Sequence, residues 1–442
     1  EISSLITKKK KSFHRFRPLT VKRHINFETR SKLEENKLDL PGMLFEEFPA
    51  RIYPNTARLT HVLGYLRVIT EKVASGKEEY KLGDVYGFSG VEKVYESFLR
   101  GKDGIEYHLV DIYGIDHGID MDNPGIPSIP GESINLTIDS KLQSLIEELF
   151  NDKQGAVICM HPFSGEILAY LSAPDYDLNS FVGPVPINIW NLWNHDGGRP
   201  LLNRVIQGLY PPGSTMKLIS IALALEQGEI NKEWTVNCNG IYTLGDHSFH
   251  CWNTAGHGNV NMYKAVFQSC NIYFYQLIQK LSFEDWNQMA GKFGFGSETD
   301  IDLYGEKKGN IPSPIYMNKK YGKYGWALGN LLTFVIGQGD ILVTPIQVAQ
   351  MMNLIASRGE SHSPNLLLNQ VSEKNNLSLK SSTWDFLDNA MWNVINHQDG
   401  TGKLARIDGA DVYGKTGTAQ NPHGEDHSWF AGYLKINNDP VI

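Results

Sequence analysis

A serine and a lysine, Ser214 and Lys217, stand three residues apart in the stretch Tyr-Pro-Pro-Gly-Ser-Thr-Met-Lys at residues 210–217. The two prolines cannot continue a helix from upstream and the glycine frees the backbone, so we predict a new helix with Ser214 in its first turn. This spacing places the lysine beside the hydroxyl on one helix face, where the two can share a proton. The pair predicts a serine nucleophile with a lysine base.

The residues that follow, 218–225, are apolar almost all round, which predicts a buried helix. Burial removes water from Lys217 and favours its neutral form, while the free N–H groups of the first turn favour negative charge on Ser214. The sequence therefore predicts an activated serine. A Ser-x-x-Lys spacing is common in helices, however, so its meaning depends on further motifs.

Two further motifs follow in order along the chain. Ser269-Cys270-Asn271 is a Ser-x-Asn triplet, and residues 415–418 read Lys-Thr-Gly-Thr. The three motifs in this order form an acyl-serine signature. On these motifs, and on Arg-Pro-Leu-Leu-Asn-Arg at 199–204 and His-Ser-Trp-Phe at 427–430, the chain resembles the class B penicillin-binding proteins. Within that family it is most similar to the penicillin-binding protein 2 group of the rod-elongation machinery.

The resemblance implies roles for the first two motifs. Ser214 would attack a D-alanyl-D-alanine carbonyl while Lys217 takes its proton, and the backbone N–H groups of Ser214 and Thr418 would receive the oxyanion. Ser269 would relay a proton to the leaving amine. Asn271 would bind the substrate amide.

The third motif is implied to complete the site. Lys415 would add to the electrostatic cluster, and Thr416 and Thr418 would hold the terminal carboxylate of the substrate. Gly417 lacks a Cβ, so we expect an extended peptide or a β-lactam to lie against this strand.

Three classes of function carry these motifs. A peptidoglycan D,D-transpeptidase would pass the acyl group to an amine of a neighbouring stem peptide, which is the reading we favour. A D,D-carboxypeptidase or β-lactamase-like hydrolase would pass it to water. A β-lactam sensor would bind without turnover.

A second constellation gathers three of the four cysteines, Cys238, Cys251 and Cys270, with His257 between them. Three thiolates and one imidazole form a closed structural zinc set, and some relatives of the elongation type carry a metal in this region. A Cys238–Cys251 disulfide or unrelated buried thiols are the alternatives. Cys159 is interpreted as a core thiol. Nearby substitute ligands are Asp246, His247 and His250.

Cys270 is the middle residue of the second motif. If that motif is extended and Ser269 and Asn271 face the substrate, alternation turns Cys270 inward. A zinc ion bound there would support the catalytic segment from behind and is not required for acyl transfer.

Composition predicts a folded protein with a sizeable core. The chain has 442 residues, of which 41% are hydrophobic, and 41 basic against 49 acidic residues argue against nucleic acid as a partner. No stretch of 18 apolar residues is present and the first residue is not methionine. Family members carry one N-terminal inner-membrane anchor, so we expect a periplasmic domain separated from its anchor, and a C-terminus that continues beyond Ile442.

The sequence pattern predicts two domains. Residues 1–130 are predicted to form a mixed α/β non-catalytic module, with a helix over 29–40 and a strand over 46–54. Residues 131–442 are predicted to form the transpeptidase domain, with Asp139 capping a helix near Leu142. Its predicted strands cover 133–138, 155–160, 166–171, 411–419 and 428–436.

The resemblance implies an α+β fold of the serine acyltransferase type, in which helices flank a mostly antiparallel sheet. It also implies partners. These are peptidoglycan stem peptides, β-lactams, a membrane glycan polymerase of the shape, elongation, division and sporulation family, and the rod-shape scaffold MreC.

Overall fold

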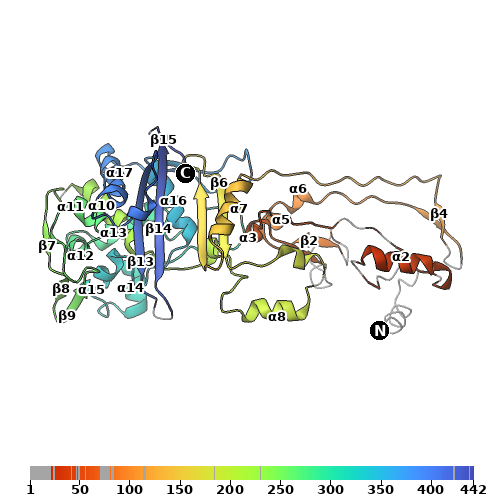
Figure 1. Cartoon of the computed structure of the whole chain (residues 1–442), viewed down its shortest axis with the longest axis horizontal. Coiled ribbons are helices and arrows are strands. Elements are labelled where there is room, and N and C mark those ends of the chain that lie inside the picture. Colours follow the sequence, from red (N-terminus) through yellow and green to blue (C-terminus); the bar gives the residue numbers. More distant parts are fainter. Residues whose placement is uncertain are drawn as a thin grey trace. The chain divides into compact units, whose positions relative to one another are not determined.

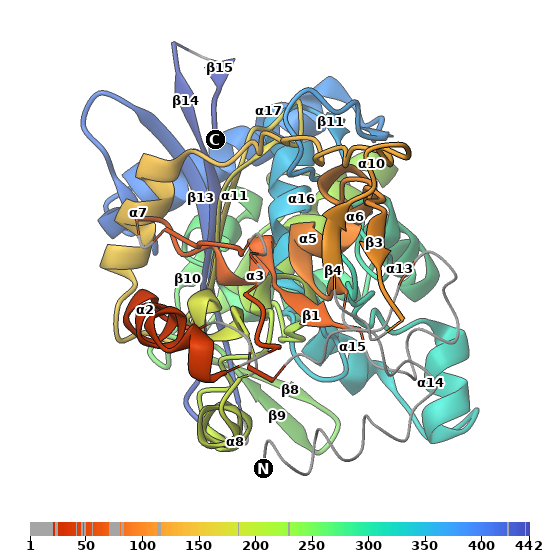
Figure 2. The same cartoon turned by 90° about the vertical axis from the view of Figure 1, so that its right-hand side faces the viewer.

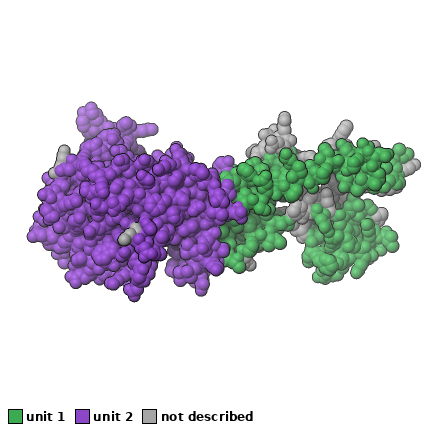
Figure 3. All heavy atoms as spheres, turned by 90° about the horizontal axis from the view of Figure 1, so that it is seen from above, with its two compact units in different colours: residues 1–134, 177–194 green, residues 135–176, 195–442 purple. Residues whose placement is uncertain are grey.

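The computed structural model describes residues 21–22, 25–40, 42–45, 47, 50–54, 56–69, 80, 84–112, 116–183, 185–228, 230–421, 424–437 and 439–442. The chain forms two compact units, which Figure 3 distinguishes by colour. Unit 1 contains Glu1–Ile134 and Asp177–Asn194, and unit 2 contains Asn135–Tyr176 and His195–Ile442. The division predicted at residue 130 did not anticipate that residues 177–194 return to the first unit.

Unit 1 consists of short helices and two-stranded antiparallel ladders, β1 with β2 and β3 with β4. The helix predicted over 29–40 is present as α2 and η1, and Asn26 caps α2 by accepting from the backbone N–H of Thr29 at 2.8 Å. The strand predicted over 46–54 is wrong for the described residues of that range, which form none. The elements are α2 (Phe27–Glu35), η1 (Lys37–Asp39), α3 (Thr60–Leu63), β1 (Leu66–Val68), β2 (Val85–Gly87), α5 (Gly90–Val94), α6 (Glu96–Leu99), β3 (His108–Val110), β4 (Asp116–Ile119), η2 (Leu178–Phe181) and α8 (Ile187–His195).

The segment 177–194 joins unit 1 through specific contacts. Asn179 donates from Nδ2 to the carbonyl of Tyr53 at 3.0 Å and accepts from its backbone N–H at 3.2 Å. The rings of Phe181 and Tyr65 stack with centroids 3.7 Å apart. Both contacts join residues far apart in sequence, which is why local patterning did not predict them.

Unit 2 contains the two hairpins expected from the sequence. β5 (Gly155–Met160) pairs with β6 (Ile167–Ala173), and β13 (Asp411–Ala419) pairs with β14 (His427–Ile436), both antiparallel. β15 (Asp439–Pro440) adds to β14 at one end of the ladder, as both views show (Figures 1 and 2). Among the described residues these hairpins belong to separate hydrogen-bonded ladders.

Asp139 caps α7 (Ser140–Leu149) as predicted, accepting from the N–H groups of Lys141 and Leu142 at 2.9 and 3.0 Å. The strand predicted over 133–138 is wrong, because only Leu136 makes a bridge there, to Leu367.

Helices pack on both hairpins and form the core, giving the α+β architecture. Figure 1 shows α17 beside β13 and α16 between the β13–β14 and β5–β6 ladders. α10 (Lys217–Gln227) is buried from Lys217 to Ala224, as its apolar sequence predicts. The remaining elements are α9 (Arg204–Gln207), η3 (Gly213–Met216), β7 (Val236–Cys238), β8 (Ile241–Leu244), β9 (His247–His250), β10 (Gly258–Val260), α11 (Met262–Phe267), α12 (Asn271–Ile278), α13 (Phe283–Lys292), α14 (Pro314–Tyr321), α15 (Leu328–Val335), α16 (Pro345–Ala356), β11 (Glu360–His362), β12 (Lys374–Asn376), α17 (Ser381–Asn396) and η4 (Lys403–Ala405).

None of the helices in the described part of the chain combines the length and the apolar character needed to cross a bilayer.

Candidate active site

Ser214 lies on the 3₁₀ turn η3, directly before α10, and Lys217 is the first residue of α10. The serine thus precedes the α-helix instead of occupying its first turn. The turn is held from β14, where the indole Nε1 of Trp429 donates to the carbonyl of Pro211 at 3.0 Å.

Close backbone packing fixes this turn. The N–H of Gly213 donates to the carbonyl of Gly337 at 3.0 Å, and a Cβ on Gly337 would stand 2.1 Å from the Gly213 oxygen. On the other side, a Cβ on Gly417 of β13 would stand 3.4 Å from the backbone nitrogen of Ser214. The turn that carries Ser214 therefore packs directly on Gly417, a contact that the sequence interpretation, based on substrate access, did not include.

The amine of Lys217 is fully buried and meets the second motif. Its Nζ lies 2.8 Å from the backbone oxygen of Ser269, 3.1 Å from its Oγ, and 2.8 Å from Oδ1 of Asn271. The predicted proton sharing with Ser214 is not formed directly, since the Ser214 hydroxyl makes no hydrogen bond to any residue within the described ranges.

Three oxygens around one amine satisfy either protonation state of Lys217. An ammonium donates to all three, whereas a neutral amine donates to the two carbonyl-type oxygens and accepts from the Ser269 hydroxyl. Burial lowers the pKa of Lys217 to about 8. The arrangement can therefore take up a proton and release it.

The second motif is a turn between α11 and α12 and not the extended segment on which the alternation argument was conditional. Ser269 adopts a left-handed backbone with φ 53°, which few residues other than glycine tolerate. Cys270 closes the turn by donating from its N–H to the carbonyl of Ala265 at 3.0 Å. Asn271 begins α12, and its Nδ2 donates to the carbonyl of His250 at 3.2 Å, so its Oδ1 faces the lysine.

Lys415 reaches the same hydroxyl from β13. Its buried Nζ lies 3.0 Å from Ser269 Oγ and 2.8 Å from the carbonyl of Thr416. Burial and the neighbouring Lys217 hold the pKa of Lys415 well below its ordinary value. Two amines thus compete for protons around one hydroxyl, so the pair loses its first proton more easily than an ordinary lysine does.

The remaining predicted residues lie on β13 beside this centre. Thr416 is half-buried and Thr418 is exposed. The hydroxyl of Thr416 lies 2.7 Å from that of Thr401, a residue that no sequence motif identified. Gly337 and Trp429 were missed as well, although each stands in a stretch, Gly-Gln-Gly or His-Ser-Trp-Phe, that could have indicated them.

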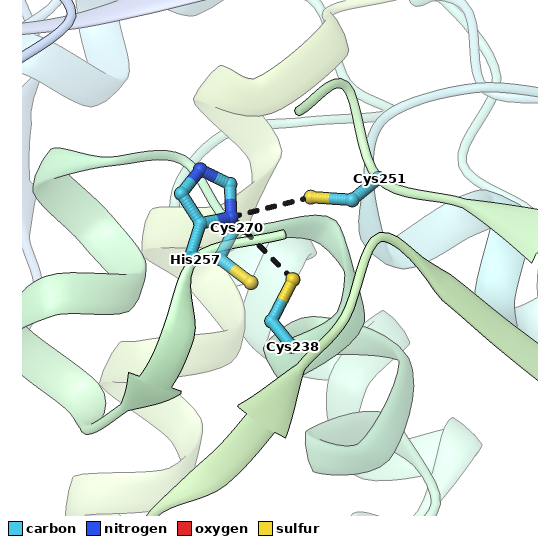
Figure 4. A group of neighbouring side chains, drawn as sticks. All are labelled: Cys238, Cys251, His257 and Cys270. Atoms are coloured by element: carbon cyan, nitrogen blue, oxygen red, sulfur yellow. Dashed lines mark hydrogen bonds between the residues drawn. The ribbon is translucent and has the colours of Figure 1, made fainter. Parts of the chain in front are cut away.

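The four predicted metal ligands come together behind the second motif. Their donor atoms all lie within 4.8 Å of one another, and Nδ1 of His257 lies 3.5 Å from Sγ of both Cys238 and Cys251. Figure 4 shows the imidazole turned toward these sulfurs, with Cys270 beside them. A tetrahedral zinc ion separates its sulfur and nitrogen ligands by about 3.6 Å, so the residues fit this metal.

The thiols of Cys251 and Cys270 share a hydrogen bond that shifts the pKa of both. Hydrogen bonding from Cys270 lowers the pKa of the Cys251 thiol, and the same contact raises that of Cys270. All four cysteines of the chain are free thiols. Cys159 lies apart on β5, where burial raises its pKa to about 11.

The suggested substitute ligands do not join the cluster. Asp246, His247 and His250 are absent from the described group of ligand atoms, and His250 contributes only its carbonyl, to Asn271 and Tyr275.

A serine on a turn at the head of a buried helix, with two buried amines on one neighbouring hydroxyl, defines a serine acyltransferase. Residues 155–442 match the penicillin binding protein transpeptidase domain, and residues 1–136 match the penicillin-binding protein dimerisation domain. The chain belongs to the penicillin-binding protein family and is a serine-type peptidoglycan D,D-transpeptidase.

Individual relatives agree with this assignment. Peptidoglycan D,D-transpeptidase MrdA of Salmonella typhimurium (strain SL1344) is 32% identical over 431 residues, covering 93% of this chain and 68% of the relative. A solved complex of penicillin-binding protein PBP2 with MreC from Helicobacter pylori has a TM-score of 0.87 at 29% identity and covers 100% of this chain and 87% of the other. A structure described as coordinating polymerization and crosslinking in a peptidoglycan synthase complex has a TM-score of 0.77 at 25% identity, covering 94% and 77%.

Proposed function

We propose that Ser214 carries the acyl group during cross-linking of peptidoglycan stem peptides. Its Oγ attacks the carbonyl of the penultimate D-alanine, and its proton passes to the neutral amine of Lys217. The tetrahedral intermediate then expels the terminal D-alanine, whose nitrogen receives a proton through Ser269. An amine of a second stem peptide attacks the ester on Ser214 and forms the amide cross-link, which breaks the ester bond and returns the proton of the amine to Ser214 Oγ.

The oxyanion of this intermediate would lie between the N–H groups of Ser214 and Thr418. The packing supports this role, because a Cβ on Gly213 would stand 3.2 Å from the nitrogen of Thr418 and one on Gly417 would stand 3.4 Å from that of Ser214. Thr416 and Thr418 would bind the terminal carboxylate, which is the group that a β-lactam also presents. Lys415 would stabilise this negative charge.

The observation that carries the proposal is the position of Lys217. A fully buried amine lies one turn after the serine and contacts Ser269 and Asn271 within 3.1 Å. Burial favours its neutral form, which a general base requires.

Mass spectrometry of the protein treated with penicillin tests this proposal. We expect one adduct on Ser214 that persists for many minutes, and none in a Ser214→Ala variant. Labelling of the Ser214→Ala variant would contradict the assigned nucleophile. Rapid release of the adduct would support a D,D-carboxypeptidase or β-lactamase-like hydrolase, and a stable adduct without cross-linking of stem peptides would support a sensor.

We further propose that Cys238, Cys251, His257 and Cys270 hold a structural zinc ion. The ion would supply a fixed tetrahedral crosslink. Its effect on the site would come through Cys270, which stands between Ser269 and Asn271. Elemental analysis of purified protein should give about one zinc per chain, and removal by a chelator should lower the melting temperature. Folded protein that contains no metal, and whose melting temperature does not change in chelator, would contradict the metal site.

The biological setting is proposed from the relatives. We propose that this enzyme acts in the periplasm, at the inner membrane, during cell elongation, with MreC and a membrane glycan polymerase as partners. The support is the similarity to a PBP2–MreC complex and to a peptidoglycan synthase complex. Saturable binding of the whole chain to MreC of the same organism tests this, and its absence would contradict the partnership.

A further inference from the structure

Thr401 stands in a glycine-flanked turn that follows α17. The turn packs tightly on the end of that helix, because a Cβ on Gly400 would stand 2.4 Å from the carbonyl of Val394 and one on Gly402 would stand 2.7 Å from Cδ1 of Ile395. The N–H of Gly402 also donates to the Val394 carbonyl at 2.9 Å. This packing gives Thr401 a fixed position.

From this position Thr401 contacts the helix that precedes the second motif and the strand that carries the third. Its N–H donates to the carbonyl of Phe267 at 3.3 Å, at the end of α11 and two residues before Ser269. Its hydroxyl oxygen lies 2.7 Å from that of Thr416 on β13. The ring of Phe267 also packs against that of His397, before the same turn, with centroids 4.3 Å apart and the planes tilted by 31°. One residue therefore links the end of α11, just before the second motif, to the third motif.

The chemistry of the ligand decides which hydroxyl donates. A carboxylate only accepts hydrogen bonds, so Thr416 can bind one only by donating its single hydroxyl proton. Thr416 must then accept from its other neighbour, and that neighbour is Thr401. The backbone carbonyl of Thr416 already accepts a hydrogen bond from Lys415 Nζ at 2.8 Å, which fixes the Thr416 backbone.

We propose that Thr401 is a positioning residue that donates to Thr416 and thereby directs the Thr416 hydroxyl toward the carboxylate of the substrate or of a β-lactam. This inference rests on the proposed function, in which Thr416 binds that carboxylate. A hydroxyl that both accepts and donates is polarised, so each hydrogen bond strengthens the other. Thr401 touches neither the substrate nor the reacting atoms.

Acylation kinetics of the whole chain with a fluorescent penicillin test the inference. Thr401→Val keeps the shape of the side chain and removes its hydroxyl. We expect the dissociation constant of the initial complex to rise about three- to tenfold, the value of a hydrogen bond of this kind, while the acylation rate constant stays within about twofold. Thr401→Ser keeps the hydroxyl and should restore affinity to within about twofold of the wild type.

A double-mutant cycle separates positioning from a general structural role. In a Thr416→Val background, Thr401→Val should cause no further loss of affinity, because the residue through which it acts is gone. Equal losses in both backgrounds would overturn the inference. If Thr401→Val fails to fold, Thr401→Ala replaces it in the same cycle, with melting temperatures recorded for every variant.

The outcomes distinguish this inference from the proposed function. If the wild type forms the Ser214 adduct but Thr401→Val binds penicillin as the wild type does, the positioning role is wrong and the proposed function stands. If Thr416→Val itself leaves affinity unchanged, both the carboxylate role of Thr416 and the role of Thr401 are wrong.

Discussion

The amine of Lys217 lies 2.8 Å from the backbone oxygen of Ser269 and 3.1 Å from its hydroxyl oxygen, across 52 residues of sequence. The amine that we propose as the base is thus held by the second motif, while Ser214, the proposed nucleophile, lies on the turn before α10. Ser269 reaches this position through a left-handed backbone, φ 53°, between two helices. The second motif therefore determines where the Lys217 amine lies.

The pH dependence of acylation should report the protonation of Lys217. Burial lowers the pKa of this amine to about 8, so its ammonium form, which cannot accept a proton, predominates at lower pH. We expect the second-order rate constant for penicillin to rise about tenfold per pH unit from about pH 6 and to level off above about pH 8. Stopped-flow measurement over this range checks it. A flat profile would show that Lys217 is not the base.

Replacing Gly337 by alanine should disable the nucleophile without touching a catalytic side chain. The new Cβ would stand 2.1 Å from the Gly213 oxygen, so the turn that carries Ser214 must shift. A displacement of about 1 Å lowers reaction rates about a hundredfold, and we expect an acylation loss of this size.

Gly228→Ala is the matched control for that variant. Gly228 has the same φ of +72°, but nothing lies within 4 Å of its Cβ position. Gly228→Ala should lower the free energy of unfolding by only about 1 kcal/mol, the cost of alanine in a left-handed conformation, and should acylate normally. Equal acylation by both variants would contradict the role assigned to Gly337.

Removing one thiol of the cluster should abolish metal binding. Cys238→Ser should contain less than about one tenth of the zinc of the wild type and melt at least about 5 °C lower, because a missing ligand opens a closed site. Cys159→Ser, whose thiol lies apart on β5, should retain the metal. Equal zinc contents in the two variants, measured by mass spectrometry of the metals, would be inconsistent with the proposed ligand set.

Asp388 on α17 should be important for stability, because its carboxylate pairs with cations from two other segments. It accepts from the hydroxyl of Tyr433, from Lys435 Nζ at 2.8 Å and from Arg358 at 3.3 Å, and its side chain is only 13% exposed. Asp388→Asn leaves the buried amine of Lys435 without its carboxylate partner, so we expect a loss of about 3 kcal/mol in the free energy of unfolding by urea.

The control for that variant is Asp385→Asn on the same helix. Asp385 pairs with Arg358 at 2.8 Å, but its side chain is 61% exposed, so its pair should contribute less than about 1 kcal/mol. A loss for Asp388→Asn no larger than for the control would contradict the importance of the buried network.

Local patterns predicted the elements that depend on nearby residues. The β5–β6 hairpin follows from two apolar runs around a short turn, the cap at Asp139 follows from its side-chain oxygen, and the burial of α10 follows from its composition. The strands predicted over 46–54 and 133–138 failed because alternation alone does not provide a continuous ladder, and residues 133–138 form only the isolated Leu136–Leu367 bridge.

By itself, the sequence determined which chemical groups are present and in what order, because three short motifs and a set of thiols can be read directly from residue types and spacing. Only the tertiary structure decided that Lys217 faces Ser269, that Gly417 packs on the turn of Ser214, that Thr401 meets Thr416, and that residues 177–194 join the first unit. Each of these contacts joins segments separated by many residues. Such contacts form only when burial of the core brings the segments together, and no local preference of the chain encodes them.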